Sequence, residues 1–249
     1  MEQAWQRDCC ELLEQTPPDT QLLSLSSPNS QCRDCGAAIK PWHNVPVLSY
    51  VFLRGCCAGC GASISSRYPI IELCTALLSF SAAMVFGPTL QLAGALLLIW
   101  SLIVLTGIDI DTQLLPDSIT LPLLWLGLLL NINSAFTSLN DAVVGAAAGY
   151  LTLWSVYWIF KLTTGKDGMG FGDFKLLAAF GAWFGWQTIP LIIILSSFVG
   201  AFIGILLILL KKQGREVPMP FGPYLAGAGL ITLFFGDRLT AAYFSFIGL

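Results

Sequence analysis

Long apolar stretches fill the chain after residue 67 and give it the hydropathy pattern of a membrane protein. Polar or proline-containing segments separate them, and each approaches the roughly 20 residues that a helix needs to cross a bilayer. The stretches fall near residues 69–86, 90–108, 119–134, 140–160, 174–187, 189–210 and 221–236. The pattern predicts an all-α polytopic membrane protein with seven transmembrane helices, of which the third and the fifth are short.

The first 67 residues have a different composition. They hold six of the fifteen acidic and five of the twelve basic residues. The start of the chain also lacks the basic-then-apolar layout of a signal peptide. We therefore expect two domains: a small N-terminal aqueous domain over residues 1–67 and a transmembrane domain over residues 68–249.

Overall composition agrees with a membrane location. The chain of 249 residues is 55% hydrophobic and 11% charged, whereas soluble proteins average about 25% charged residues. The net charge of -3 gives no support for nucleic-acid binding.

Basic residues indicate the orientation in the membrane, because cytoplasmic loops are enriched in Lys and Arg. Eleven of the twelve basic residues fall on one side of the predicted spans and only Arg238 on the other. The eleven are Arg7, Arg33, Lys40, Arg54, Arg67, Lys161, Lys166, Lys175, Lys211, Lys212 and Arg215. The N-terminal domain is thus expected in the cytoplasm and the C-terminus outside.

Two aspartate motifs lie on that same predicted cytoplasmic side. One is Gly107-Ile108-Asp109-Ile110-Asp111, and the other is Gly170-Phe171-Gly172-Asp173. We expect both in loops that border apolar spans, where ionised groups are costly and tend to mark functional sites. Helix capping is the alternative for Asp173, which precedes an apolar helix, but Asp109 lies about one turn inside an apolar run, where no cap is needed.

Two carboxyl groups that meet at such a border cannot readily both ionise, so they share one proton. That state suits an aspartic protease, in which the ionised partner activates water and the protonated partner polarises the peptide carbonyl. Asp111 is the rival for the role of Asp109, since two nearby acids also suit a hard metal ion. Asp117, after Pro116, is interpreted as a turn or cap residue.

Four cysteines have the spacing of a zinc ribbon. Cys32 and Cys35 form one CxxC motif, Cys57 and Cys60 form the second, and a glycine follows each motif. Four thiolates satisfy a tetrahedral structural zinc site, and disulfides would not persist in a reducing cytoplasm. Cys56 is interpreted as a spare thiol, and the lone histidine, His43, as a surface or packing residue. A domain this small is expected to gain folding free energy from the metal.

Together these features resemble the type IV prepilin leader peptidase/N-methyltransferase family of membrane aspartic proteases. The resemblance covers almost the whole chain. It rests on the two cysteine motifs and on residues 44–50 and 53–55, which lie between them. Further matching segments are residues 66–69, 72–73, 109–117, 165–176 and 220–224, the last with the sequence Pro220-Phe221-Gly222-Pro223-Tyr224.

By this resemblance, Asp109 and Asp173 are the catalytic pair, in a multi-pass protein of the bacterial inner membrane. The family cleaves the short basic leader of prepilins and pseudopilins on the cytoplasmic side. It then methylates the new N-terminal amine with S-adenosylmethionine, a role associated with the cysteine domain. Family members usually open with an additional apolar helix, whereas Met1 to Arg7 is polar here, so we expect that helix to be missing.

Two other functions are compatible with the pattern. One is a transporter or assembly scaffold whose border carboxylates move protons and whose cysteine domain docks partners. The absence of charges in the middle of most predicted spans argues against it. The other is a shortened, inactive remnant of the peptidase.

Overall fold

The computed structural model describes residues 30–32, 34–211 and 220–247. Residues 1–29 of the expected N-terminal domain, including Arg7, lie outside the described part. So do three other basic residues used for the orientation, Arg33, Lys212 and Arg215. The structure divides into two compact units, Met1–Leu73 and Cys74–Leu249.

The described residues of the first unit, 30–32 and 34–73, contain little regular structure before α3. The 3-10 helix η1 (Pro41–Asn44) and the short helix α2 (Leu48–Phe52) lie between the two cysteine motifs. Two isolated antiparallel bridges, Gln31 with Ala38 and Cys56 with Ser63, close the loops that carry those motifs. The first turns of α3 (Arg67–Phe86) complete the unit.

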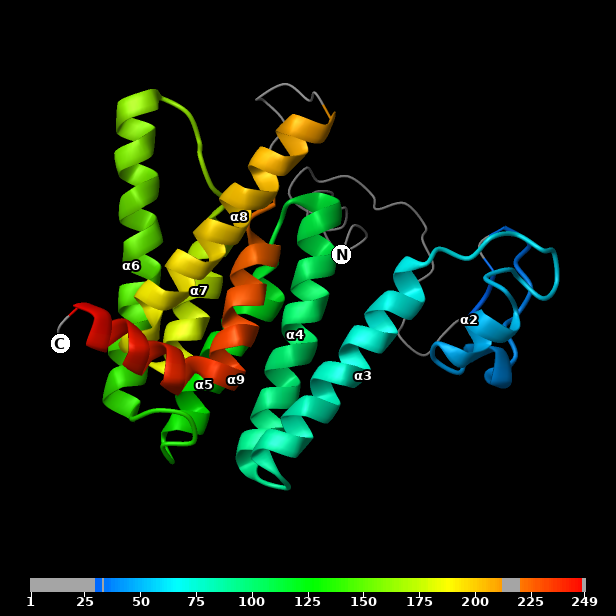
Figure 1. Cartoon of the computed structure of the whole chain (residues 1–249), viewed down its shortest axis with the longest axis horizontal. Helices are drawn as coiled ribbons and strands as arrows, with labels where there is room; N and C mark the ends of the chain where they lie inside the picture. Colours follow the sequence, from blue (N-terminus) through cyan, green and yellow to red (C-terminus); the bar gives the residue numbers. More distant parts are fainter. Residues whose placement is uncertain (1–29, 33, 212–219, 248–249) are drawn as a thin grey trace, which may run out of the picture. The chain divides into compact units, whose positions relative to one another are not determined.

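In the described part of the second unit, all regular secondary structure is helical (Figure 1). After α3 it contains α4 (Leu90–Thr112), α5 (Asp117–Asn131), α6 (Leu139–Thr164), α7 (Phe171–Phe184), η2 (Trp186–Thr188), α8 (Ile189–Lys211) and α9 (Gly222–Ile247). Each predicted apolar stretch thus corresponds to one helix.

Among the residues that the structure describes, five helical segments are long and apolar enough to cross a membrane. They are Arg67–Phe86, Leu90–Thr112, Leu139–Thr164, Trp186–Leu206 and Gly222–Ser245. The other two predicted spans are short, since α5 has 15 residues and α7 has 14. At 1.5 Å per residue, α7 extends only about 21 Å, less than the roughly 30 Å hydrocarbon core.

Helix α7 is surrounded by protein. Nearly every residue from Asp173 to Trp183 is buried, with Lys175 as the exception, and the helix packs against α5, α6 and α9. Glycines permit the closest approach, because a Cβ at Gly149 would lie 2.6 Å from the carbonyl oxygen of Leu177. Gly145 and Gly181 form a second backbone contact between α6 and α7. Small residues allow such packing in membranes, where helix association depends on close contact.

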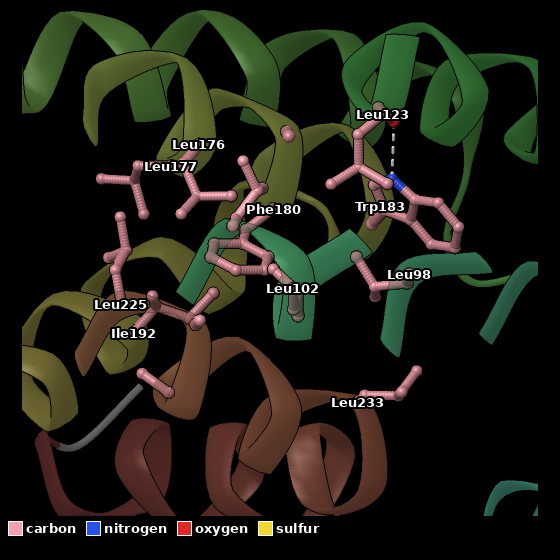
Figure 2. Close-up of a cluster of buried hydrophobic side chains, with 14 of the residues drawn as sticks. Leu98, Leu102, Leu123, Leu176, Leu177, Phe180, Trp183, Ile192, Leu225 and Leu233 are labelled. Atoms are coloured by element: carbon pink, nitrogen blue, oxygen red, sulfur yellow. Dashed lines mark hydrogen bonds between the residues drawn. The ribbon is translucent and has the colours of Figure 1, made fainter. Parts of the chain in front are cut away.

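The core around α7 is shown in Figure 2. Leu98 and Leu102 of α4 belong to the same buried cluster as Phe180 and Trp183. The Trp183 indole N–H donates to the carbonyl oxygen of Leu123 at 2.8 Å. Asn131, fully buried at the end of α5, donates to the carbonyl oxygens of Ala182 and Trp183 at 2.8 and 3.0 Å. Satisfied polar groups of this kind fix one register in an otherwise apolar core.

Candidate active site and cysteine cluster

Asp109 lies in the last turn of α4. Its side chain is 4% exposed, and its Oδ2 accepts a hydrogen bond from the backbone N–H of Gly222 at 2.9 Å. Gly222 is the first residue of α9, where the backbone N–H groups have no partner within the helix. Helix α4 ends three residues later at Thr112, followed by Gln113 in the left-handed conformation with a φ of 56°.

Asp173 is the third residue of α7, and its side chain is 7% exposed. The N-cap of α7 is Gly170, which makes no side-chain capping hydrogen bond. Asp173 is therefore not the N-cap residue, but it lies in the first turn of α7, where the positive end of the helix dipole favours a carboxylate. The prediction that both aspartates lie in loops is wrong: α4 includes the whole motif from Gly107 to Asp111, and α7 begins at Phe171, directly after its N-cap Gly170.

Leu115 connects the two aspartate motifs. A Cβ at Gly172 would lie 2.6 Å from the Leu115 Cβ, and a Cβ at Gly222 would lie 3.2 Å from its Cδ2 and 2.6 Å from Oδ2 of Asp109. Both aspartates therefore lie beside Leu115, Asp173 through the preceding Gly172 and Asp109 through Gly222. The rival residue, Asp111, is exposed on the surface of α4.

An ion pair joins α5 and α7 beside this site. Lys175 Nζ lies 2.6 Å from both carboxylate oxygens of Asp117. Asp117 is the first residue of α5, and the N-cap is Pro116. The interpretation of Asp117 as a turn or cap residue is therefore wrong, and its partner on α7 was not foreseen. The pair ties the first turn of α7 to the segment that follows α4.

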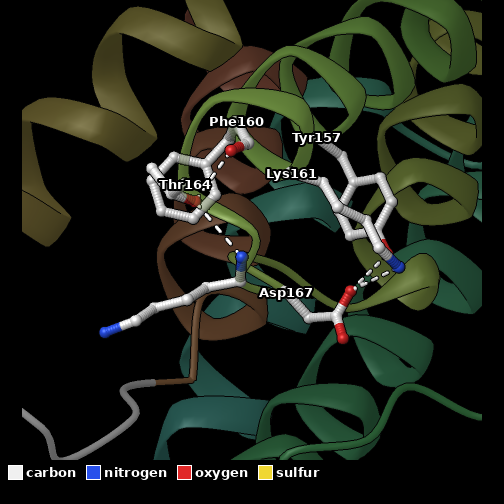
Figure 3. Close-up of polar contacts among 6 residues, drawn as sticks. Tyr157, Phe160, Lys161, Thr164 and Asp167 are labelled. Carbon is white, nitrogen blue, oxygen red and sulfur yellow. Dashed lines mark hydrogen bonds and ion pairs between the residues drawn. The ribbon is translucent and has the colours of Figure 1, made fainter.

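A second polar cluster holds the loop before Asp173 (Figure 3). The Tyr157 hydroxyl donates to Oδ1 of Asp167 at 2.6 Å, and Lys161 Nζ lies 2.9 Å from both the Tyr157 oxygen and Asp167 Oδ1. The hydrogen bonds from Lys161 and Tyr157 lower the pKa of Asp167 below its ordinary value. We call Tyr157, Lys161 and Asp167 the loop clamp.

The loop clamp extends into the aromatic packing of α7. The Tyr157 ring centroid lies 5.2 Å from that of Phe171 and 5.7 Å from that of Phe174. Phe171 and Phe174 flank Asp173 on α7, so Tyr157 contacts the helix that carries the carboxyl group as well as the preceding loop, through Asp167.

The four predicted zinc ligands gather in the first unit. The Sγ atoms of Cys32, Cys35, Cys57 and Cys60 all lie within 4.8 Å of one another. The two motifs repeat the same hydrogen bonds: Gly36 N–H to Cys32 O and Gly61 N–H to Cys57 O, both at 2.9 Å. Gly36 and Gly61 have φ angles of 68° and 74°, which glycine adopts without strain.

These sulfurs fit a tetrahedral zinc ion. Zn–S bonds of about 2.3 Å place the sulfurs roughly 3.8 Å apart, and Cys32 Sγ lies 3.9 Å from Cys60 Sγ. Backbone N–H groups of Cys60 and Gly59 lower the pKa of Cys57 to about 7. Although the Ala62 N–H favours the Cys60 thiolate, the sulfurs of Cys35 and Cys57 raise the pKa of Cys60 to about 12. The cluster thus has the sulfur ligands and the spacing that a bound metal ion requires.

Cys56 and His43 are not part of this cluster. Cys56 Sγ lies 3.6 Å from the Arg54 carbonyl oxygen. His43 packs edge-on to Trp42, with ring centroids 6.2 Å apart. Both structural positions agree with the interpretations made from the sequence.

Comparison with known proteins decides the family. A prepilin leader peptidase/N-methyltransferase of Pseudomonas aeruginosa is 52% identical over 249 residues, covering 100% of this chain and 86% of that protein. The chain belongs to the type IV leader peptidase family. Family models match residues 96–205 as the type IV leader peptidase family and residues 10–86 as the bacterial peptidase A24 N-terminal domain.

Other relatives in this family carry the same name. The protein of Aeromonas hydrophila is 57% identical over 90% of this chain and 78% of its own length. That of Legionella pneumophila is 45% identical over 99% of this chain and 86% of its own length. No solved structure matches the chain.

Reasoning from sequence missed several residues that position the site of this family member. Gly222 lies 113 positions from Asp109, and Lys175 lies 58 positions from Asp117. Tyr157 and Lys161 sit in an apolar helix with no motif around them. The one available signal was their spacing, since residues four apart share a helix face.

Proposed function

We propose that this protein cleaves the leader peptides of type IV prepilins and related pseudopilins, with Asp109 and Asp173 as its catalytic pair. The observation that carries the proposal is that Leu115 packs against Gly172, which directly precedes Asp173, and against Gly222, which bonds Asp109, so that two buried carboxyl groups from α4 and α7 lie in one region of a chain otherwise poor in charge. Family membership supports the same reaction, since the relatives compared above are named leader peptidases.

The contacts of Asp109 suggest how the two roles are divided. An N–H donor bonds more strongly to a carboxylate than to a carboxylic acid, and Gly222 donates to Asp109. We assign to Asp109 the ionised role, taking a proton from the attacking water. Asp173 then holds the shared proton, polarises the scissile carbonyl and later assists departure of the amine.

The proposed membrane arrangement uses all seven helices. Buried between its neighbours, α7 does not need the full length of a lipid-exposed span, because protein rather than lipid surrounds it. Asp109, Leu115, Asp173 and Gly222 then lie at one end of the bundle. The distribution of basic residues supports a cytoplasmic position for that end, in the bacterial inner membrane.

We also propose that residues 1–67 form a zinc-stabilised cytoplasmic domain and residues 68–249 the peptidase domain. Cys32, Cys35, Cys57 and Cys60 would hold the zinc ion, which contributes folding free energy. The names of the relatives further support N-methylation of the new pilin N-terminus. S-adenosylmethionine would supply the methyl group, and we assign no residue to its binding.

The test uses the full chain reconstituted in lipid vesicles together with a purified prepilin. Mass spectrometry is expected to show loss of the leader and, with S-adenosylmethionine present, addition of one methyl group to the new N-terminus. Proton flux without a cleaved product would favour the transporter alternative. An intact prepilin with no flux would favour the scaffold or the inactive remnant.

A further inference from the structure

Large apolar side chains are exposed together on the first unit, around η1 and α2. Trp42 is 64% exposed, Leu48 58%, Val51 67% and Phe52 83%. With Val45, also exposed, they fall within eleven consecutive positions. We call these five residues the α2 surface. Contiguous apolar patches of this kind usually mark contact with a protein or a membrane.

The α2 surface is fixed beside the start of a candidate membrane span. The Val47 N–H, directly before α2, donates to Oε2 of Glu72 at 2.8 Å. Glu72 belongs to α3, which is long and apolar enough to cross a bilayer. The Ser49 hydroxyl donates to the carbonyl oxygen of Trp42 at 2.8 Å and so joins η1 to α2. We call the hydrogen bond from Val47 to Glu72 the anchor of this pair of helices.

The backbone turn at the anchor is strained. Val47 has φ 58° and ψ −49°, and the Leu48 N–H bonds back to the Pro46 carbonyl oxygen at 2.5 Å. A positive φ is costly for a β-branched residue and persists only where surrounding contacts enforce it. The hydrogen bond to Glu72 is such a contact, and it holds α2 at this place on α3.

Basic side chains border the apolar residues. Lys40 Nζ lies 5.6 Å from the centre of the Trp42 ring, and Arg54 follows α2 on an exposed turn. Segments that lie in the interface of anionic bilayers typically combine tryptophan and aliphatic residues with neighbouring Lys or Arg.

We propose that the α2 surface inserts into the headgroup region of the bilayer that α3 crosses. Its partner is lipid, because the hydrogen bond to α3 holds the surface at the membrane without any second protein, and because its basic border matches anionic headgroups. Insertion would hold the cysteine cluster, whose two motifs flank η1 and α2, against the membrane. This inference does not depend on the proposed peptidase activity.

The test places a photoreactive diazirine amino acid at Phe52 in the full chain, reconstituted in vesicles of phosphatidylethanolamine and phosphatidylglycerol. Ala58, exposed on the second cysteine motif, is the matched control position. After illumination, mass spectrometry of the digested protein is expected to show several-fold more lipid adduct at position 52 than at position 58. Because Phe52 is already exposed, the replacement leaves the packing of the unit in place.

Equal lipid labelling at the two positions would overturn the proposal. Adducts at position 52 to a second copy, to another part of this chain or to added prepilin would overturn it too, and would identify the occupant. As a second measurement, Lys40→Gln should lower lipid labelling at position 52 in anionic vesicles but not in vesicles of phosphatidylcholine alone. An equal effect in both vesicles would contradict the role of the basic border.

Discussion

The backbone N–H of Gly222 donates a hydrogen bond to Oδ2 of Asp109, and the two residues have no space between them for a side chain. A Cβ at position 222 would lie 2.6 Å from that carboxylate oxygen and 3.2 Å from Leu115 Cδ2. The start of α9 therefore sets the position of a carboxyl group on α4. In the proposed reaction, this contact orients the group that activates water.

Gly222→Ala is expected to lower leader cleavage by about 10- to 100-fold, because displacements of about 1 Å at a reacting group have effects of that size. Gly227→Ala is the matched control on the same helix, since a Cβ there would meet nothing within 4 Å. Cleavage rates of both variants in vesicles would check this. Equal activity of the two variants would show that the contact does not orient Asp109.

Tyr157→Phe removes the hydroxyl that donates to Asp167 but keeps the ring that packs on Phe171 and Phe174. We expect a several-fold loss in kcat with the amount of folded protein unchanged, because the loop before Asp173 loses its clamp. Tyr150→Phe is the control: this ring also packs on Phe174, with centroids 6.0 Å apart. A similar loss in both variants would point to general packing rather than the loop clamp.

The loop clamp should depend on pH through Asp167. Its pKa is lowered in the folded protein by Lys161 and Tyr157, so its stabilising effect is complete above the ordinary Asp value of about 3.9 and is lost as the pH falls through the lowered pKa. Hydrogen exchange of residues 165–170 should therefore be faster in Asp167→Asn than in the unchanged protein at pH 7. The two should converge at the most acidic pH that the protein tolerates, and a difference that grew on acidification would contradict the assignment.

Hydropathy was sufficient to predict the helices, because helix faces that contact lipid and helix faces that contact the protein core are both apolar. Each helix therefore appears in the sequence as a continuous apolar stretch. It could not separate lipid-exposed helices from α7, which is apolar on nearly all sides because other helices surround it. Hydropathy also ended the second span too early: Asp109 is polar but continues α4, since the N–H of Gly222 satisfies its carboxylate within the fold.

The cysteine cluster was predictable because its ligands are grouped by local spacing and glycine turns. The contacts around the aspartates were not predictable from local spacing. Gly222 meets Asp109, and Lys175 meets Asp117, only because the helices that carry them pack together. The position of Leu115 between Gly172 and Gly222 depends on the same packing. Tyr157 and Asp167 are separated by ten positions and a helix end, and no local pattern indicates that such residues meet.

Cys57→Ser should lose the metal, and we expect the first unit to become more sensitive to proteases while the transmembrane helices stay folded. Cys56→Ser is the adjacent control, because Cys56 lies outside the four-sulfur cluster. Elemental analysis is expected to find about one zinc ion per chain in the unchanged protein and in Cys56→Ser. Full zinc content in Cys57→Ser would exclude the proposed ligand set.

Leader cleavage by aspartate variants in lipid vesicles tests the catalytic pair most directly. Asp109→Asn and Asp173→Asn should each lower the cleavage rate by about 10²- to 10⁴-fold, the contribution expected of general acid–base groups, while both proteins remain in the membrane. Asp111→Asn, at the exposed neighbouring acid, should retain most of the activity. Normal cleavage by either of the first two variants, or its loss only in Asp111→Asn, would contradict the account.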